Sequence, residues 1–172
     1  SAILLYSASD VALWRDADLH RHPFLSKLGP DVLDPALDAG SVERRLRDPR
    51  FRNRTLAGLL LDQGFLAGMG NYLRAEVLFE AALSPRARPF DLDDDKRRRL
   101  AAALLAVPRH SYRTRGIEPA RGMRADYLAD ADSGFRFRVF DREGQPCPRC
   151  GMAIVRETLA GRRLYACPAC QP

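Results

Sequence analysis

The chain has 172 residues, of which 46% are hydrophobic, so it suits one medium-sized domain or two small ones and is too apolar for a disordered chain. Its 28 basic residues exceed its 22 acidic ones by 6, and all but two of the basic residues are arginine, whose planar donor fork suits phosphate groups. No apolar run approaches the roughly 18 residues of a membrane span, and no secretory leader pattern appears, so we expect a cytoplasmic protein with no membrane contact and a polyanionic partner.

The first residues predict an unpaired strand. The run Ile-Leu-Leu-Tyr at 3–6 is apolar, and no partner strand precedes it, so it would leave an exposed sheet edge. We therefore expect that the chain begins inside a larger protein; a processed terminus or a tag remnant is the alternative. Residues 20–35 are rich in turn formers, which is typical of a linker.

Two helices are predicted in the next part of the chain. Ser41 is a plausible N-cap for a short helix that Pro49 ends. A second helix is expected from Leu56 to about Leu66, because apolar residues recur there near helical spacing. The segment Gly-Met-Gly-Asn at 68–71 interrupts this pattern.

Two further helices are predicted after the interruption. The first runs to about Leu83 and carries Arg74 and Glu76 on its polar face. The second follows the acidic run at 91–95, which complements the positive end of the helix dipole, and Pro108 stops it.

The rest of the chain has three segments of different composition and pattern. Residues 109–134 are arginine-rich and read as irregular. From Phe135 to Val139, apolar residues alternate with arginine, which predicts an amphipathic strand. A four-cysteine segment then completes the chain.

The strongest signal for a binding site is the spacing of the cysteines. Cys147 with Cys150, and Cys167 with Cys170, form two Cys-x-x-Cys pairs, each a tight knuckle that aims two thiolates at one point. The residues between the pairs, 151–166, are enough for a β-hairpin that brings the knuckles together. This pattern predicts one structural Zn²⁺ bound by four thiolates; disulfides or a redox pair are the alternatives.

The same hairpin presents an arginine. Strands are expected at 153–155 and 164–166 with Gly161 in the turn, which places Arg162 at the tip. A guanidinium on a rigid turn can reach a DNA phosphate, whereas a solvated turn arginine is an equally good interpretation of the spacing.

The glycine-rich turn at 68–71 is a second candidate contact. Gly70 lets the backbone approach a phosphate closely, and the following helix offers free N–H groups. Asn71 can donate its amide to that phosphate or cap the helix, and the residues alone favour the cap.

The turn at 62–76 and the four-cysteine ribbon together resemble a known protein family. The two-helix turn Asp-Gln-Gly-Phe-Leu-Ala-Gly-Met-Gly-Asn-Tyr-Leu-Arg-Ala-Glu at 62–76, together with the ribbon ending Cys-Pro-Ala-Cys-Gln at 167–171, resembles the helix-two-turn-helix DNA glycosylases, which include formamidopyrimidine-DNA glycosylase and endonuclease VIII. The resemblance covers almost the whole chain. It is nearer to endonuclease VIII through the segments at 4–10, 22–24, 29–33 and 49–54.

The resemblance implies both an activity and a set of contacts. Members of the family excise oxidised bases, in the endonuclease VIII branch mainly pyrimidines, from duplex DNA and then cleave the abasic strand by elimination. In them, the Asn of the Gly-x-Gly-Asn turn and the Arg of the ribbon hairpin grip the phosphates beside the extruded nucleotide, which corresponds to Asn71 and Arg162 here. Glu76 matches a recurrent acid of the family, for which we expect a structural pairing with a nearby arginine.

The chain departs from the family at the catalytic group. The family nucleophile is the amine of an N-terminal proline in a Pro-Glu-Gly-Pro-Glu start, and this chain contains no such sequence. His20, His22 and His110 form no ligand or triad spacing either. We therefore expect no catalytic residue in this chain, which would bind DNA as a monomer while the missing part of a parent enzyme performs the chemistry.

The predicted fold class is α+β in four parts. We expect the tail of an N-terminal β-sandwich at 1–19, a linker at 20–36, a helix-two-turn-helix domain at 37–134 and a zinc ribbon at 135–172. The alternatives are a non-catalytic zinc-ribbon DNA-binding module and a zinc ribbon of the transcription or translation machinery, of which the latter leaves the turn at 68–71 unexplained.

Overall fold

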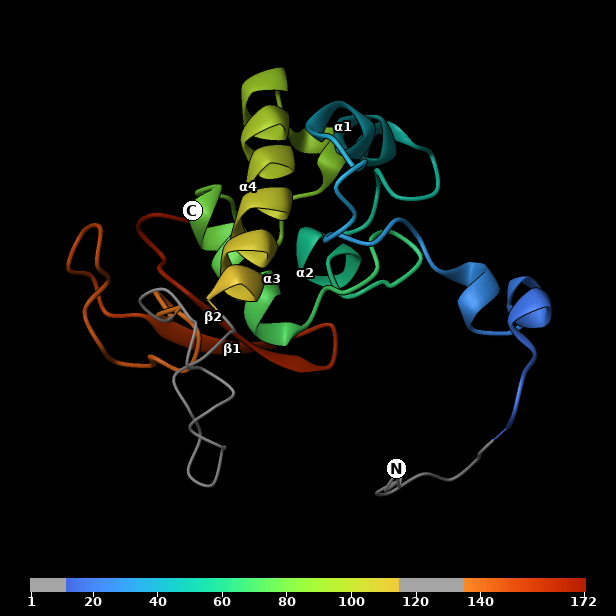
Figure 1. Ribbon diagram of the computed structural model, residues 1–172. Helices are drawn as coiled ribbons and strands as arrows, with labels where there is room; N and C mark the ends of the chain where they lie inside the picture. Colours follow the sequence, from blue (N-terminus) through green and yellow to red (C-terminus); the bar gives the residue numbers. More distant parts are fainter. Residues whose placement is uncertain (1–11, 115–134) are drawn as a thin grey trace, which may run out of the picture.

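The computed structural model describes residues 12–114 and 135–172 as a helical body followed by a two-stranded ribbon (Figure 1). This confirms the expected α+β class. In chain order the elements are η1 (Asp16–Arg21), η2 (Leu25–Lys27), α1 (Ala39–Arg47), α2 (Leu56–Leu59), α3 (Asn71–Glu80), η3 (Pro89–Asp91), α4 (Asp94–Arg113), β1 (Val155–Leu159) and β2 (Arg162–Ala166). The predicted strand at 3–6 and most of the predicted irregular, arginine-rich segment, at 115–134, lie outside the described residues.

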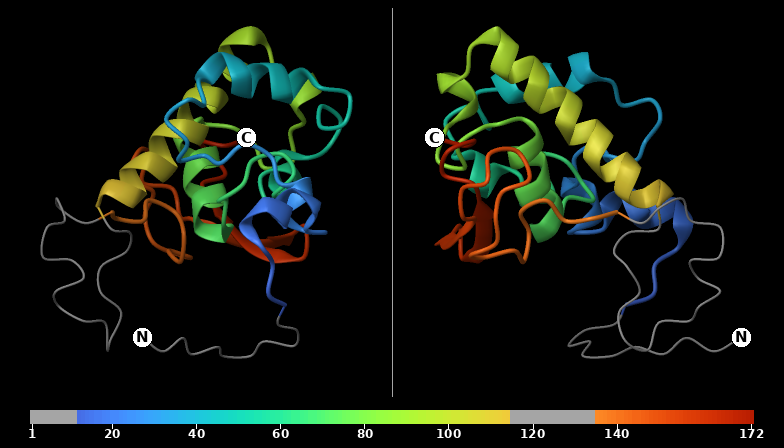
Figure 2. Two further views of the ribbon diagram at one scale, coloured as in Figure 1. Left: turned by 45° about the vertical axis from the view of Figure 1, so that its right-hand side comes forward. Right: turned by 90° about the vertical axis from the view of Figure 1, so that its left-hand side faces the viewer.

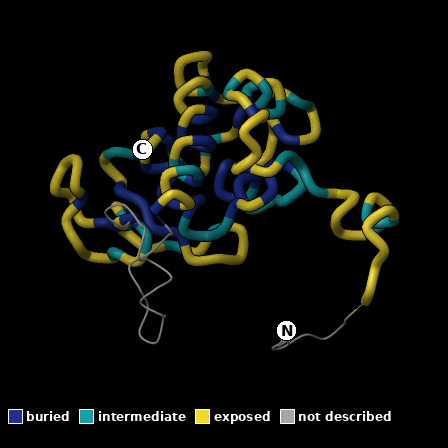
Figure 3. Tube along the Cα trace, in the orientation of Figure 1, coloured by how far each residue is buried: buried dark blue, intermediate teal, exposed yellow. Residues whose placement is uncertain are grey.

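Helix α4 crosses the helical body, and the ribbon lies at the end of the molecule where α3 begins and α4 finishes (Figure 2). Buried residues follow the helices and one side of the ribbon, whereas the described residues before Leu28 are mostly exposed (Figure 3). Helix α3 packs against both α4 and β2, so it joins the two parts of the fold. Among the described residues, no helix has the length and apolar character needed to cross a membrane.

The N-cap of helix α1 lies three residues before the predicted one. Asp38, not Ser41, is the N-cap, and its carboxylate accepts a hydrogen bond of 2.7 Å from the backbone N–H of Ser41. Ala39 and Gly40 therefore belong to the first turn. Either polar residue could cap a helix here, and the structure uses the earlier one.

The second predicted helix is largely a loop. Helix α2 has only four residues, and the apolar residues that follow it, among them Leu60 and Phe65, are fully buried within turns. Gln63 holds these turns together, because its amide donates to the Met69 carbonyl at 2.9 Å and accepts from the Gly68 N–H at 3.1 Å. The apolar spacing in this segment therefore reflects burial and not helical structure.

Helix α4 continues through Pro108 to Arg113, so the prediction that Pro108 ends it is wrong. A proline inside a helix removes one backbone hydrogen bond but has a φ close to the helical value. Pro108 and Leu104 are both buried in the core, and this packing maintains the helix. Arg109 therefore lies on a helix and not in the irregular segment predicted after Pro108.

The predicted strand at 135–139 is absent from the described residues, although its burial alternates as expected. Phe135 and Val139 are buried while Arg136 and Arg138 are exposed. The segment has no partner strand in the described chain, and the N–H groups of residues 138–140 donate to a carboxylate instead. Alternating hydrophobicity thus predicted the faces but not the hydrogen bonding.

The ribbon is an antiparallel hairpin whose register pairs Val155 with Ala166 and Leu159 with Arg162. Its two-residue turn has positive φ at both positions, 52° at Ala160 and 71° at Gly161, as a tight hairpin requires. The strands extend further toward this turn than predicted, and Arg162 stands at the tip as expected.

Candidate metal centre and nucleic-acid interface

The four predicted cysteines converge on one point. The sulfur atoms of Cys147, Cys150, Cys167 and Cys170 all lie within 4.8 Å of one another. The Cys147–Cys170 and Cys150–Cys167 sulfur separations are 3.9 and 3.4 Å, close to the edge of about 3.8 Å in a tetrahedral ZnS₄ group and far longer than a disulfide bond. The donor set therefore fits one four-coordinate zinc ion with no position left for water, which makes the metal structural.

The first knuckle is fixed to the end of α3 by Arg149. Its guanidinium lies 4.4 Å from the centre of the Phe79 ring and donates to the Phe79 carbonyl at 2.6 Å. It also donates to the Glu80 carbonyl at 3.2 Å. These carbonyls belong to the last turn of α3, where positive side chains are favoured by the helix dipole.

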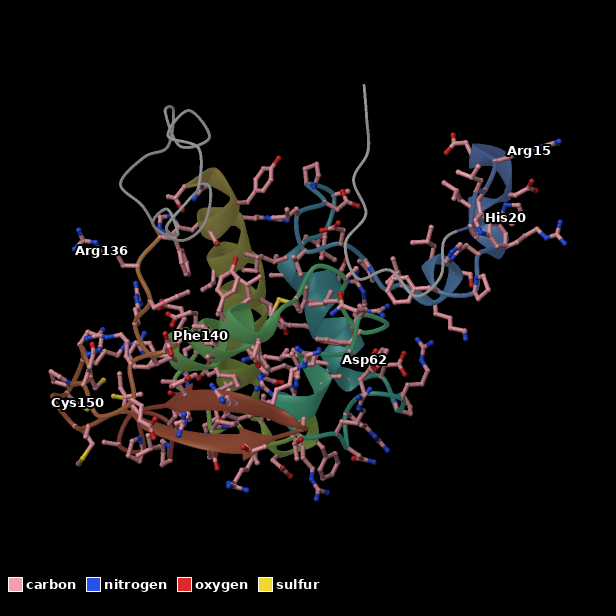
Figure 4. The ribbon with its side chains drawn as sticks, turned by 90° about the horizontal axis from the view of Figure 1, so that it is seen from below. Arg15, His20, Asp62, Arg136, Phe140 and Cys150 are labelled. Carbon is pink, nitrogen blue, oxygen red and sulfur yellow. The ribbon has the colours of Figure 1, made fainter. Side chains whose placement is uncertain are left out.

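The second knuckle is fixed in the same region by Gln171. The buried side-chain oxygen of Gln171 accepts from the Cys167 N–H at 3.0 Å, and its amide donates to the Leu83 carbonyl at 3.2 Å. The metal centre is therefore attached to the helical body just beyond the C-terminal end of α3. Seen from below, the ribbon runs from this centre, marked by Cys150, toward the side of the molecule that carries Asp62 (Figure 4).

The tip of the ribbon meets the opposite end of α3. Asn71 is the first residue of the helix, and its amide donates to the Arg163 carbonyl at 2.9 Å. The structure thus brings the turn at 68–71 and the hairpin tip together, although 92 positions separate the two bonded residues. Arg162, next to Arg163, is exposed at this junction.

The side chain of Asn71 does not cap the helix. Gly70 is the N-cap, with extended backbone at φ −115°, and no side chain bonds the first turn there. Among the described residues, no atom lies within 4 Å of a Cβ placed on Gly70, so the described chain leaves the space beside this residue open. The N-terminal N–H groups of α3 therefore face an open approach, which favours the binding of an anion.

Arg74 is a residue whose position the sequence pattern missed. Predicted on a polar face, it is fully buried, because its guanidinium binds carbonyl groups of α2 and of the hairpin. Burial, and to a smaller extent the neighbouring Arg162 guanidinium, lowers the pKa of Arg74 to about 10, so the side chain stays positively charged at neutral pH. Helical periodicity offered no sign of this, since the partners lie far away in sequence.

Glu76 is also buried, and within the described residues it binds backbone N–H groups and no arginine side chain. Its carboxylate accepts from the N–H groups of Arg138, Val139 and Phe140 at 2.9 to 3.1 Å. The expectation of a structural role agrees with this geometry, and the described partners are backbone N–H groups in place of the expected arginine side chain. The result is a fixed path for the chain from these residues into the ribbon.

Two family matches cover most of the described chain. Residues 28–118 match the formamidopyrimidine-DNA glycosylase H2TH domain, and residues 144–172 match the zinc finger found in FPG and IleRS. The chain belongs to the formamidopyrimidine-DNA glycosylase H2TH family. The zinc-finger match and the cysteine cluster together establish one structural Zn²⁺ in this family member.

Individual relatives agree with this assignment. The chain is 51% identical over 169 residues to endonuclease 8 of Shigella sonnei (strain Ss046) and 49% identical over 170 residues to endonuclease 8 of Enterobacter sp. (strain 638). The matches cover 98 and 99% of this chain and 62% of each relative, so the chain spans less than two thirds of their length.

Solved structures resemble the fold over a similar extent. The MutM (Fpg) protein from Thermus thermophilus superposes with a TM-score of 0.75 at 36% identity, over 91% of this chain and 58% of that one. The Lactococcus lactis Fpg in complex with abasic-site DNA gives a TM-score of 0.76 at 24% identity, over 91 and 56% of the two chains. At the latter identity the likeness concerns the fold alone.

Proposed function

We propose that this chain is the DNA-binding part of a base-excision-repair DNA glycosylase and AP lyase of the endonuclease 8 type. Family membership and the identity of about half to endonuclease 8 relatives support this proposal. The proposed partner is duplex DNA that contains a damaged base or an abasic site, as in the complexes of the structurally similar Lactococcus lactis Fpg.

One observation carries the proposal. The hydrogen bond between Asn71 and the Arg163 carbonyl sets the open N-terminal end of α3 beside the exposed hairpin arginine Arg162. An amide donor, free helical N–H groups and a guanidinium then point to one region, and all three prefer an anionic oxygen. We propose that Gly70, Asn71 and Arg162 grip phosphates of the DNA backbone there.

The chemistry of the proposed parent protein is the removal of oxidised bases, mainly pyrimidines, followed by β/δ-elimination at the abasic site. That chemistry needs an amine nucleophile, and in the family this amine belongs to a proline in a Pro-Glu-Gly-Pro-Glu start, which this chain lacks. We therefore propose that the 172-residue chain binds damaged DNA without acting on it.

Borohydride reduction tests this division of labour. The chain is incubated with a duplex that contains an abasic site, and binding is followed by fluorescence anisotropy before and after reduction. We expect binding but no covalent adduct, because no proline amine is available to form a Schiff base. A reduced adduct of the chain would show that it carries its own nucleophile, and an absence of binding would contradict the proposed function itself.

A further inference from the structure

Arg74 is the side chain through which three parts of the fold are joined. Its Nη1 donates to the Ala57 carbonyl at 3.0 Å and to the Leu159 carbonyl at 3.1 Å. Its Nη2 donates to Asn71 Oδ1 at 2.7 Å and to the Arg163 carbonyl at 3.0 Å. The guanidinium thus connects α2, the first turn of α3 and both strands of the hairpin at its tip.

These bonds determine which way the Asn71 amide points. Because its oxygen accepts from Arg74, the amide is held with Oδ1 toward the guanidinium and its NH₂ group toward the hairpin. One Nδ2 hydrogen goes to the Arg163 carbonyl, and the second remains available. An amide held in this orientation offers its remaining N–H to a hydrogen-bond acceptor such as a phosphate oxygen.

The same contacts fix the position of the hairpin arginine. Arg74 Nη2 also lies 3.5 Å from the Arg162 carbonyl, and Arg163 accepts from both Arg74 and Asn71. The backbone carbonyls of Arg162 and of the next residue, Arg163, are therefore bonded to side chains at the N-terminal end of α3. A shift of the Arg74 guanidinium would move both proposed DNA contacts together.

The positive charge at this junction has no counter-charge among the residues that the structure describes. Within the described residues no carboxylate pairs with Arg74, which bonds only to neutral oxygen atoms. Its Nε, buried as well, has no hydrogen-bond partner in the described part of the chain. With Arg162 close by, the region holds two positive groups for which a phosphate would supply the opposite charge.

We infer that Arg74 is a positioning residue, which orients the Asn71 amide and the Arg162 hairpin tip toward one DNA backbone phosphate without touching it. This inference rests on the proposed function, since it names the group that assembles the same site. It also predicts that the helical body and the ribbon are coupled in binding at this one buried side chain.

A double-mutant cycle distinguishes positioning from a general structural role. Affinity for an abasic-site duplex is measured for Arg74→Lys and Arg74→Met, each alone and together with Asn71→Ala. We expect the Arg74 changes to weaken binding about tenfold in the native background and by no more than about twofold when Asn71 is already alanine, since the two residues act as a unit. An equal loss in both backgrounds would overturn the inference.

Arg45→Lys is the matched control. Arg45 also uses a partly buried guanidinium to bind carbonyl groups, those of Gly64 and Phe65, but contacts neither Asn71 nor the hairpin in the described structure. We expect any effect of Arg45→Lys on affinity to be the same with and without Asn71→Ala. Zinc content and thermal unfolding are measured for every variant.

A second measurement leaves Arg74 intact, so it holds even if its variants unfold. In the ¹⁵N-labelled native chain, the side-chain NH₂ signals of Asn71 should shift when the duplex is added, because the free hydrogen meets a phosphate. Unchanged signals at saturation would overturn the inference. If Asn71→Ala and Arg162→Ala leave the affinity unaltered, the DNA-contact site in the proposed function is wrong. If both substitutions weaken binding but the double-mutant cycle is additive, only the role inferred for Arg74 is wrong.

Discussion

Two buried charged side chains of α3, Arg74 and Glu76, face different segments of the chain. Positions two apart on a helix lie about 200° apart around its axis, so the guanidinium faces α2 and the hairpin while the carboxylate faces residues 138–140. Each is bonded to backbone and not to the other. Glu76 thereby fixes the segment that leads into the ribbon, and Arg74 fixes the tip of the ribbon.

Replacing Glu76 tests how much this anchoring contributes to folding. In Glu76→Gln, the amide nitrogen meets N–H groups that the carboxylate oxygens now accept from, so donors are left unsatisfied. We expect a loss of roughly 2–3 kcal/mol in the free energy of unfolding, typical of hydrogen bonds to a buried charge. Urea unfolding followed by circular dichroism measures it.

Glu80→Gln provides the comparison on the same helix. Glu80 is more exposed and pairs with Arg138 and with Arg149, so we expect a change of about 0–1 kcal/mol. Equal losses for the two variants would mean that the N–H groups of residues 138–140 find other partners.

At the level of elements, the sequence indicated the zinc ribbon and the turn at 68–71 correctly and misjudged the segments between them. Cysteine spacing is a local constraint, so the knuckles and the hairpin tip at Arg162 could be predicted. Pro108 is buried on a helix that packs against α1 and α3, and the apolar residues of the loop after α2 belong to the same core, so both depend on residues far along the chain. Arg74 and Glu76 bind backbone far along the chain, which no periodicity reveals.

Removal of zinc tests the ribbon as an element. Without metal, the four cysteine side chains lose the ion that holds them together and the small hairpin loses its closure, whereas the helices keep their own core. With a chelator we expect the backbone NMR signals of residues 144–172 to collapse, those of α1 and α4 to persist, and DNA affinity to fall at least about tenfold because Arg162 loses its position. If the zinc-free chain kept its DNA affinity, the folded ribbon would not be needed for binding, which would contradict this prediction.

On the scale of the whole molecule, α3 connects the metal centre to the proposed DNA contacts. Arg149 and Gln171 attach the knuckles near its C-terminal end, and Asn71 with Arg74 attaches the hairpin tip at its N-terminal end. The ribbon is therefore held at both ends by one helix. This arrangement would let a structural zinc site support the proposed DNA contacts at the opposite end of the helix.

The salt dependence of DNA affinity tests the central claim most directly. Affinity for an abasic-site duplex is measured over a range of salt for the native chain, Arg162→Ala, Asn71→Ala and Arg98→Ala. Arg98 is the charge-matched control, an exposed arginine near the start of α4 that pairs with Asp95.

If Asn71 and Arg162 grip the phosphates, Arg162→Ala lowers the affinity and reduces the log–log slope by about 0.9, the value for one phosphate contact. Asn71→Ala, which removes no charge, lowers the affinity at every salt concentration with little change of slope, and Arg98→Ala resembles the native chain. Slopes and affinities of Arg162→Ala and Asn71→Ala that match those of Arg98→Ala would contradict the account.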